Sequence, residues 1–160
     1  MIMERFKKMF WGIVIIVFCI GLDQLTKVLA RVYLKNKPIV IIKNFFNLTY
    51  VENRGGAWGA FSGRLWLFIL ITIAALGLLF YLFKDFNLEN NKFYSIGIAL
   101  VISGAIGNFI DRIIFKYVTD FLDFKIFGYD FPVFNVADIC ITIGVAMLII
   151  KLVILKDSKA

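Results

Sequence analysis

The chain has 160 residues, of which 61% are hydrophobic and 17% aromatic, and its mean hydropathy is +0.88. Soluble domains are about 45–50% apolar, so this composition predicts a single integral-membrane domain over residues 1–160. The net charge of +7 comes from basic residues at the ends of apolar runs, which favours contact with the lipid bilayer over nucleic-acid binding. The sequence has no histidine, which excludes Ser-His and Cys-His nucleophile pairs and the HExxH zinc site. Cys19 and Cys140 lie inside apolar runs, which indicates buried thiols and no disulfide framework.

The first apolar run, residues 10–22, follows a basic segment and so imitates a secretory signal peptide. No A-x-A-like cleavage site follows it, which predicts a retained membrane helix. Because the run alone is too short to cross a bilayer, the predicted span covers residues 10–33 and includes Asp23 and Lys27. These two side chains are i, i+4 neighbours. They form either a local ion pair near the interface or part of a polar cavity, and the sequence favours neither.

Residues 38–60 have the pattern of a small β-structure. Pro38 stops the preceding helix, and apolar residues alternate with others over residues 46–51. The sequence Asn53-Arg54-Gly55-Gly56 then predicts a turn, followed by a glycine-rich aromatic loop. Asn53 is either a turn residue or a polar group aimed at a substrate carbonyl. We therefore expect a small sheet at one face of the membrane.

Three further apolar runs have the length and composition of membrane helices. They cover residues 65–83, 93–113 and 134–155. The first of them carries no ionisable group, which indicates a structural role. Together with residues 10–33 they predict an all-α membrane protein with four transmembrane helices and a small β-cradle.

The helix predicted over residues 93–113 presents small and polar residues on one face. These residues, at positions i, i+3, i+4 and i+7, are Gly104, Gly107, Asn108 and Asp111. Glycines at this spacing let another helix approach closely. The face is either a packing seam that ends in an ion pair at the headgroups or a polar pocket between helices. Asp111 is followed by Arg112, so we expect these two to pair and Asp111 to have a structural role.

Residues 113–132 join the last two spans and combine aromatic side chains with Asp120, Asp123 and Asp130. This mixture predicts an interfacial segment that lies on the membrane surface. Just beyond it, Asn135 and Asp138 stand three residues apart, on one face of the last predicted helix.

Charge does not orient the four spans. Both termini lie on one side, and the 18 Lys and Arg residues divide 8 to 10 between that side and the other. The acidic residues are less even, because 7 of the 11 lie on the side of residues 38–60. Any chemistry is expected on that side.

Two carboxylates at one membrane face can carry out aspartyl proteolysis. One is ionised and takes a proton from water, while the other is protonated and donates to the peptide carbonyl. Asp138 is the best candidate, and its partner is Asp120, Asp123 or Asp130. Intramembrane carboxylates also serve as ion or proton relays in transporters, and glycine seams assemble membrane scaffolds, so both are alternatives.

Five ordered blocks along the chain resemble the lipoprotein signal peptidase (signal peptidase II) family. The blocks are Asp23-Gln24-x-Thr26-Lys27, Asn53-Arg54-Gly55-Gly56-Ala57-Trp58-Gly59, Gly104-Ala105-x-Gly107-Asn108-x-x-Asp111-Arg112, Val118-Thr119-Asp120-Phe121 and Phe134-Asn135-x-Ala137-Asp138. Their order and spacing agree with the family over about the whole chain. Thr119 is a minor departure, since a valine is common there.

The resemblance implies removal of the signal peptide from bacterial prolipoproteins, just before a cysteine that carries a diacylglyceryl group. It implies no metal or cofactor, a catalytic dyad of Asp120 and Asp138, and substrate contacts from Asn53 and Arg112. The supporting residues would be Asp23, Lys27, Asn108, Asp111 and Asn135. It also implies a multi-pass protein of the bacterial plasma membrane, with cytoplasmic termini and an extracytoplasmic active site. We expect a monomer.

Overall fold

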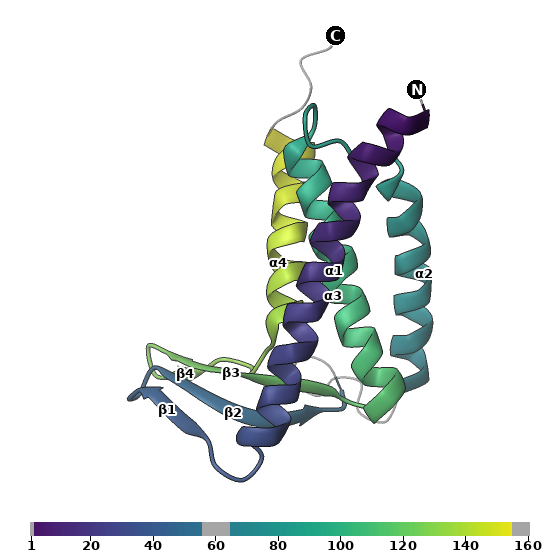
Figure 1. Ribbon diagram of the computed structural model, residues 1–160. Coiled ribbons are helices and arrows are strands. Elements are labelled where there is room, and N and C mark those ends of the chain that lie inside the picture. The colour runs from purple at the N-terminus through teal and green to yellow at the C-terminus, as the bar shows by residue number, and fades with distance from the viewer. Residues whose placement is uncertain (1, 56–64, 155–160) are drawn as a thin grey trace.

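A computed structural model of the protein describes residues 2–55 and 65–154. Four helices stand side by side, and an antiparallel sheet lies across one end of them (Figure 1). The helices are α1 (Ile2–Tyr33), α2 (Leu65–Phe83), α3 (Lys92–Phe115) and α4 (Val136–Ile149), and α4 continues into a π-helical segment, η2 (Ile150–Ile154). The start of α1 and the end of η2 both lie at the end opposite the sheet.

All four helices contain a segment that is long and apolar enough to cross a membrane. These segments are Met9–Tyr33, Leu65–Phe83, Lys92–Phe115 and Val136–Val153. The predicted four-helix layout is therefore confirmed, with one shift at the start of the last helix. That helix begins at Val136 because Asn135 is its N-cap and Phe134 forms a β-bridge with Leu122.

The sheet is larger than the sequence suggested. It has four antiparallel strands in the order β1 (Ile39–Ile42), β2 (Phe46–Asn53), β3 (Val118–Ile126) and β4 (Tyr129–Asp130). The strands within residues 38–60 were expected, whereas residues 118–126 were expected only as an interfacial segment. Their aromatic residues suggested a surface belt, and the strand forms because β2 supplies an antiparallel partner, with Leu48 opposite Leu122 and Val51 opposite Asp120. The position of this segment at a membrane surface stays a prediction, and the glycine-rich loop lies outside the described residues.

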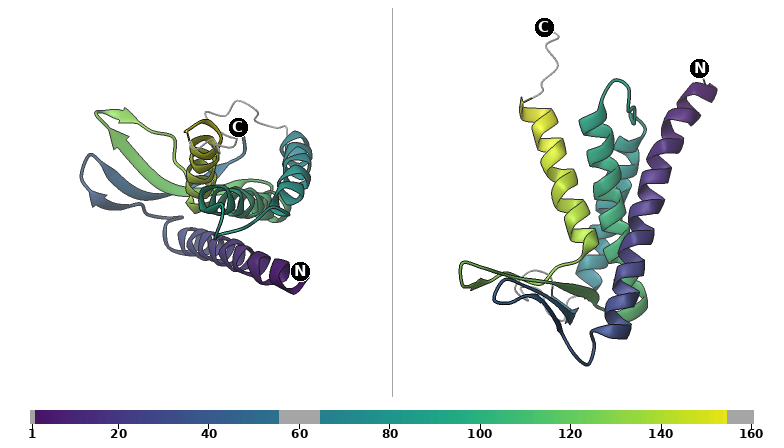
Figure 2. Two further views of the ribbon diagram at one scale, coloured as in Figure 1. Left: turned by 90° about the horizontal axis from the view of Figure 1, so that it is seen from above. Right: turned by 60° about the vertical axis from the view of Figure 1, so that its left-hand side comes forward.

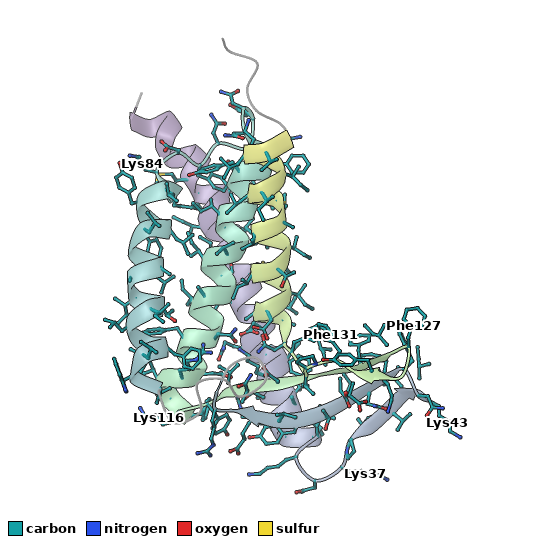
Figure 3. All side chains as sticks on the ribbon, turned by 180° about the vertical axis from the view of Figure 1, so that it is seen from behind. Lys37, Lys43, Lys84, Lys116, Phe127 and Phe131 are labelled. Atoms are coloured by element: carbon teal, nitrogen blue, oxygen red, sulfur yellow. The ribbon has the colours of Figure 1, made fainter. Side chains whose placement is uncertain are left out.

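The sheet projects sideways beyond the helices (Figure 2). Its aromatic residues pack together where β2 and β3 meet the start of α4, with ring centroids of Phe46 and Phe124 4.4 Å apart and those of Phe124 and Phe134 5.7 Å apart. Phe127 and Phe131 lie on the side of the sheet that faces the helices (Figure 3). The side of the sheet that faces the helices therefore carries apolar side chains.

α3 lies between the other helices, and small residues let its neighbours come close. A Cβ atom on Gly104 would overlap the carbonyl oxygen of Ala137 in α4, and one on Gly107 would stand 2.5 Å from Asp23 Oδ2 in α1. The glycine face predicted for this helix is therefore a packing seam, and it contacts both α1 and α4. The same helix also places the polar side chains of Asn108 and Arg112 at a cavity.

Candidate active site

Hydrogen bonds from backbone N–H groups hold β3 and the start of α4 beside the end of α3. Lys116 takes the left-handed conformation (φ 67°) that ends α3, and the Thr119 N–H then donates to Asp111 Oδ2 at 2.8 Å. On the other edge, the N–H groups of Phe121 and Leu122 both donate to the Phe134 carbonyl, at 3.0 and 2.8 Å. Asp120 of β3 is thereby placed beside the first turn of α4.

Asp120 and Asp138 line one open cavity of about 1090 Å³ between α2, α3, α4 and the sheet. Both oxygens of each carboxylate accept an N–H. Asp120 accepts from Asn53 Nδ2 at 2.8 Å and from Asn135 Nδ2 at 2.6 Å. Asp138 accepts from Asn108 Nδ2 at 2.8 Å and from the Asn135 backbone N–H at 3.2 Å. The two carboxylates are therefore held by amide donors from β2, α3 and the start of α4.

Asn135 joins the two carboxylates through a single residue. It caps α4 in a capping box, in which its Oδ1 accepts the Asp138 N–H at 3.0 Å and its own N–H donates to Asp138 Oδ2. Because Oδ1 is committed to that backbone donor, the amide nitrogen is the atom left to face Asp120. A helix N-terminus also favours a carboxylate in its first turn.

Asp120 is 2% exposed, and its burial disfavours the charged form. Burial raises the pKa of Asp120 to about 7, the hydrogen bond from Asn53 lowers it, and the nearby charge of Asp138 raises it. This carboxyl therefore holds a proton nearer to neutral pH than an ordinary aspartate does. A proton donor and a proton acceptor can thus coexist in the pair.

A buried ionic cluster lies behind the pair, between α1 and α3. Lys27 is fully buried, and its Nζ lies 2.9 Å from Asp23 Oδ2, 2.9 Å from Asn108 Oδ1 and 3.7 Å from Asp111 Oδ2. Asp23 also accepts the Ala137 N–H at 2.8 Å, which ties α1 to α4. Asp23 and Lys27 thus form an ion pair inside a buried polar cluster, and neither is among the described residues that line the cavity.

The expected pair of Asp111 with Arg112 is not found within the described residues. Asp111 instead faces Lys27 and Arg31, whose Nη1 lies 3.6 Å from its Oδ1. The reason is geometric, because consecutive residues on a helix do not share a face. Arg112 points into the cavity, where its Cζ lies 4.7 Å from the centre of the Phe68 ring.

Of the three possible partners of Asp138, the structure brings Asp120 to it. Among the described residues that line the cavity, neither Asp123 nor Asp130 occurs. Asp123 accepts from Asn47 Nδ2 at 3.3 Å, and Asp130 is exposed and lies 3.1 Å from Lys125 Nζ. These two carboxylates belong to the projecting part of the sheet.

Arg31 is a residue of the site that the sequence pattern did not single out. Its Nη1 donates to Thr119 Oγ1 at 2.7 Å, next to Asp120, and its Cζ lies 4.3 Å from the centre of the Phe115 ring. The signal was present, since Asp23, Lys27 and Arg31 follow one another at four-residue steps. Within residues 2–55 and 65–154 no group of His, Cys, Asp and Glu is placed to hold a metal ion, and independence from metals stays a prediction.

A family model that describes signal peptidase (SPase) II matches residues 15–154. The chain belongs to the signal peptidase II family. Lipoprotein signal peptidases of Staphylococcus aureus are similar over nearly the whole length. That of strain bovine RF122 / ET3-1 is 44% identical over 156 residues, covering 96% of this chain and 94% of the relative, and that of strain JH9 is 46% identical over 157 residues, with the same shares.

Two solved structures also match, both described as bacterial membrane enzymes obtained by the in meso method. The first, at 2.3 Å resolution, has a TM-score of 0.82 and 43% identity, and covers 93% of this chain and 91% of its own. The second, at 1.9 Å resolution, has a TM-score of 0.79 and 44% identity, and covers 92% and 94%. The family predicted from the five sequence blocks is therefore confirmed. As a signal peptidase II, the protein is a protease with four helices able to span a membrane.

Proposed function

We propose that this signal peptidase II is an aspartyl endopeptidase that acts within the membrane on diacylglyceryl-modified bacterial prolipoproteins. It would cut just before the lipidated cysteine and so release the signal peptide. The observation that carries this proposal is the pairing of Asp120 with Asp138 through Asn135, at the inner wall of a cavity bounded by three apolar helices.

The two carboxylates supply both proton transfers of peptide hydrolysis. One ionised carboxylate takes a proton from water as the water oxygen attacks the scissile carbonyl carbon, and the protonated partner gives its proton to the carbonyl oxygen. The resulting diol collapses as the C–N bond breaks and the leaving nitrogen takes a proton. The products are a free carboxylate on the signal peptide and a free amino group on the lipidated cysteine. With a pKa of about 7, Asp120 suits the protonated role in the first step.

The cavity walls suit a substrate that arrives through lipid. Phe68, Ile71 and Ala75 of α2 face Ile139 and Ile143 of α4 across it, so an apolar signal helix or acyl chains would meet an apolar lining.

Two polar groups at the cavity would orient the scissile bond. Arg112 is long, cationic and exposed to the cavity, and would donate charge-assisted hydrogen bonds to a substrate carbonyl. Asn53 lines the cavity and donates to Asp120 Oδ2, so its side chain would contact the substrate beside that carboxyl.

The sheet and the dyad lie at the same end of the helices, opposite the start of α1. We propose that this end is extracytoplasmic, that the termini are cytoplasmic, and that the enzyme works as a monomer in the bacterial plasma membrane. The sheet would then lie beside the headgroups, where the lipidated part of the substrate emerges.

The test is cleavage of a purified diacylated prolipoprotein in detergent, followed as a gel shift. We expect wild type to cut, Asp120→Asn and Asp138→Asn to lose all activity while remaining folded, and Asp130→Asn to cut normally. Asp130 is the matched control because it is an exposed carboxylate on β4, outside the described cavity lining. Cleavage by either dyad variant would contradict the aspartyl mechanism. Failure of folded wild type to cut would instead make ion transport in liposomes the next measurement.

A further inference from the structure

Lys27 is the most deeply buried cation of the described residues, and it lies next to the dyad without touching it. Its side chain is fully buried between α1 and α3. Its ammonium lies 2.9 Å from Asn108 Oδ1, and Asn108 Nδ2 in turn donates to Asp138 Oδ1 at 2.8 Å. One amide group therefore separates the lysine from the carboxylate.

An asparagine amide has two ends of opposite hydrogen-bonding character, and its neighbours decide which end points where. An ammonium group has donors only, so it accepts no hydrogen bond and the Asn108 oxygen must face Lys27. The nitrogen end then faces Asp138. If the amide were reversed, two donors would meet at Lys27 and two acceptors at Asp138, and the latter contact would require a protonated carboxyl.

Asn135 also donates to the Asn108 oxygen, but through a longer hydrogen bond than that of Lys27. Its Nδ2 reaches Asn108 Oδ1 at 3.2 Å, but the same nitrogen donates to Asp120 Oδ1 at 2.6 Å and lies 3.4 Å from the Thr119 carbonyl. Two protons are thus shared among three acceptors, and the shortest contact goes to Asp120. Lys27 is the principal donor that fixes the Asn108 oxygen.

We propose that Lys27 is a positioning residue that sets the direction of the Asn108 amide, so that Asp138 always meets an N–H donor. The proposal rests on the proposed function, because it assigns Lys27 a part in preparing the dyad for proton transfer. Asn135 does the same for Asp120, with the Asp138 backbone N–H as the donor that fixes its oxygen. Both carboxylates are then presented with N–H groups whose direction cannot reverse.

Lys27 also carries a charge close to the dyad, so its ionic effect has to be separated from its effect on the Asn108 amide. On the Lys27 side of Asn108 the charged groups are Asp23 and Arg31 of α1 and Asp111 of α3. On the cavity side they are Arg112 of α3, Asp120 of β3 and Asp138 of α4. Asp23 and Asp111 offset part of the charge of the two α1 cations, yet the charge of Lys27 still lowers the pKa of Asp120. A variant that loses this charge but keeps an N–H donor therefore separates the ionic effect from the effect on the amide.

The experiment compares Lys27→Met, which cannot donate, with Lys27→Gln, which is neutral but can donate an N–H. Wild type and both variants are assayed on the diacylated prolipoprotein for kcat and KM from pH 5 to pH 9. We expect kcat of Lys27→Met to fall by about tenfold or more, the usual effect of losing a hydrogen bond to a charged group, with little change in KM. The acidic limb of its kcat profile should move up by about one pH unit, because a carboxylate without its donor holds a proton more readily. Lys27→Gln should keep most of the wild-type kcat and profile.

Arg31→Met is the control for loss of charge. It removes a cation one turn away that also faces Asp111 but, among the described residues, forms no hydrogen bond with Asn108. We expect it to move the acidic limb by less than half as much as Lys27→Met. Because Lys27→Met leaves buried carboxylates short of a cation, both Lys27 substitutions are also made together with Asp23→Asn, which restores the balance of charge if the single variants do not fold.

The outcomes distinguish this proposal from the proposed function. If wild type does not cut, the proposed function fails. If wild type cuts and Lys27→Met matches it in kcat and pH profile, the positioning role is overturned while the protease stands. Equal losses in Lys27→Met and Lys27→Gln would also overturn it, because a purely ionic or packing role would affect both alike.

Discussion

Asp120 is held by two amide donors, and yet burial raises its pKa to about 7 from the ordinary 3.8. A group whose pKa is raised on folding binds its proton more tightly in the folded state. Its contribution to the free energy of unfolding is fully present below the unfolded pKa and is lost as pH rises through the folded value. The relevant window therefore runs from about pH 4 to about pH 8.

We expect the melting temperature of wild type in detergent to fall by several degrees from pH 5 to pH 8, and that of Asp120→Asn to fall less. The amide cannot titrate, so its curve lacks the contribution of Asp120. Thermal melts followed by circular dichroism at half-unit steps would measure this. Parallel curves for the two proteins would show that Asp120 titrates at its ordinary value.

Arg112 is the cation that faces the cavity, and it stacks on Phe68 instead of pairing with Asp111. A guanidinium offers two parallel donors and an aromatic stacking face, which an ammonium does not. We expect Arg112→Lys to lower kcat/KM by about tenfold, mostly through KM, with the fold unchanged. Lys116→Ala, which removes an exposed cation at the residue that ends α3, should stay within about twofold of wild type. Equal effects would mean that only net charge near the site matters.

At the level of the elements, the position of Asp138 depends on how closely α4 approaches α3. A Cβ on Gly104 would overlap the Ala137 carbonyl and lie 2.7 Å from Ile141 Cγ1, whereas one on Gly77 of α2 would meet nothing within 4 Å. We expect Gly104→Ala to push the first turn of α4 outward, lowering activity by about tenfold or more and reducing thermal stability. Gly77→Ala should leave activity intact and slightly raise stability, since alanine favours a helix. Activity assays and melts on both variants would test this, and wild-type behaviour of Gly104→Ala would contradict the observed packing.

Some elements could be predicted from the sequence because one local signal decided each of them. The helix over residues 65–83 is uncharged and apolar throughout, and its predicted bounds are those of α2. β3 could not be decided locally, because its aromatic residues fit both a surface belt and a strand. Pairing with β2, some 70 residues earlier, selects the strand. Long-range pairing of this kind has no signature within either segment.

The same distinction applies to the site. Residue types and helical spacing grouped Asn108 and Asp111 correctly on one face, but the choice of Asp120 as partner of Asp138 depended on family resemblance. Spacing cannot make that choice, because Asp120 is brought to α4 by contacts that form only in the folded chain, such as the hydrogen bonds of β3 to the Phe134 carbonyl and of Asn135 to Asp120. Nor could adjacency in sequence predict the basic partners of Asp111, which are a lysine and an arginine from α1.

At the level of the whole molecule, the site is assembled from elements that only the closed bundle brings together. The Asp23 carboxylate accepts the Ala137 N–H across 114 residues of sequence, and Lys27 reaches Asn108 across 81. A bundle closed in this way has two unlike ends. The sheet and dyad occupy one, and the connection between α2 and α3 lies at the other (Figure 1).

These two ends give the proposed orientation a direct test. Lys43 lies at the tip of the sheet and Lys84 at the opposite end of the molecule, and both are exposed (Figure 3). In a background with Cys19→Ala and Cys140→Ala, we expect Lys43→Cys to react with a membrane-impermeant maleimide on intact bacteria. Lys84→Cys should react only after the cells are permeabilised, because the bilayer would separate it from the reagent.

Both single-cysteine proteins must first cleave the prolipoprotein, so that labelling is measured on a correctly inserted enzyme. The reverse pattern would place the dyad at the cytoplasmic face, and the proposed site of cleavage would then be wrong even if the chemistry is right. Labelling of both cysteines on intact cells would contradict a fixed orientation. Labelling of Lys43→Cys alone would place the carboxylates on the side of the membrane where the lipidated cysteine has to emerge, because the dyad and the sheet share one end of the bundle.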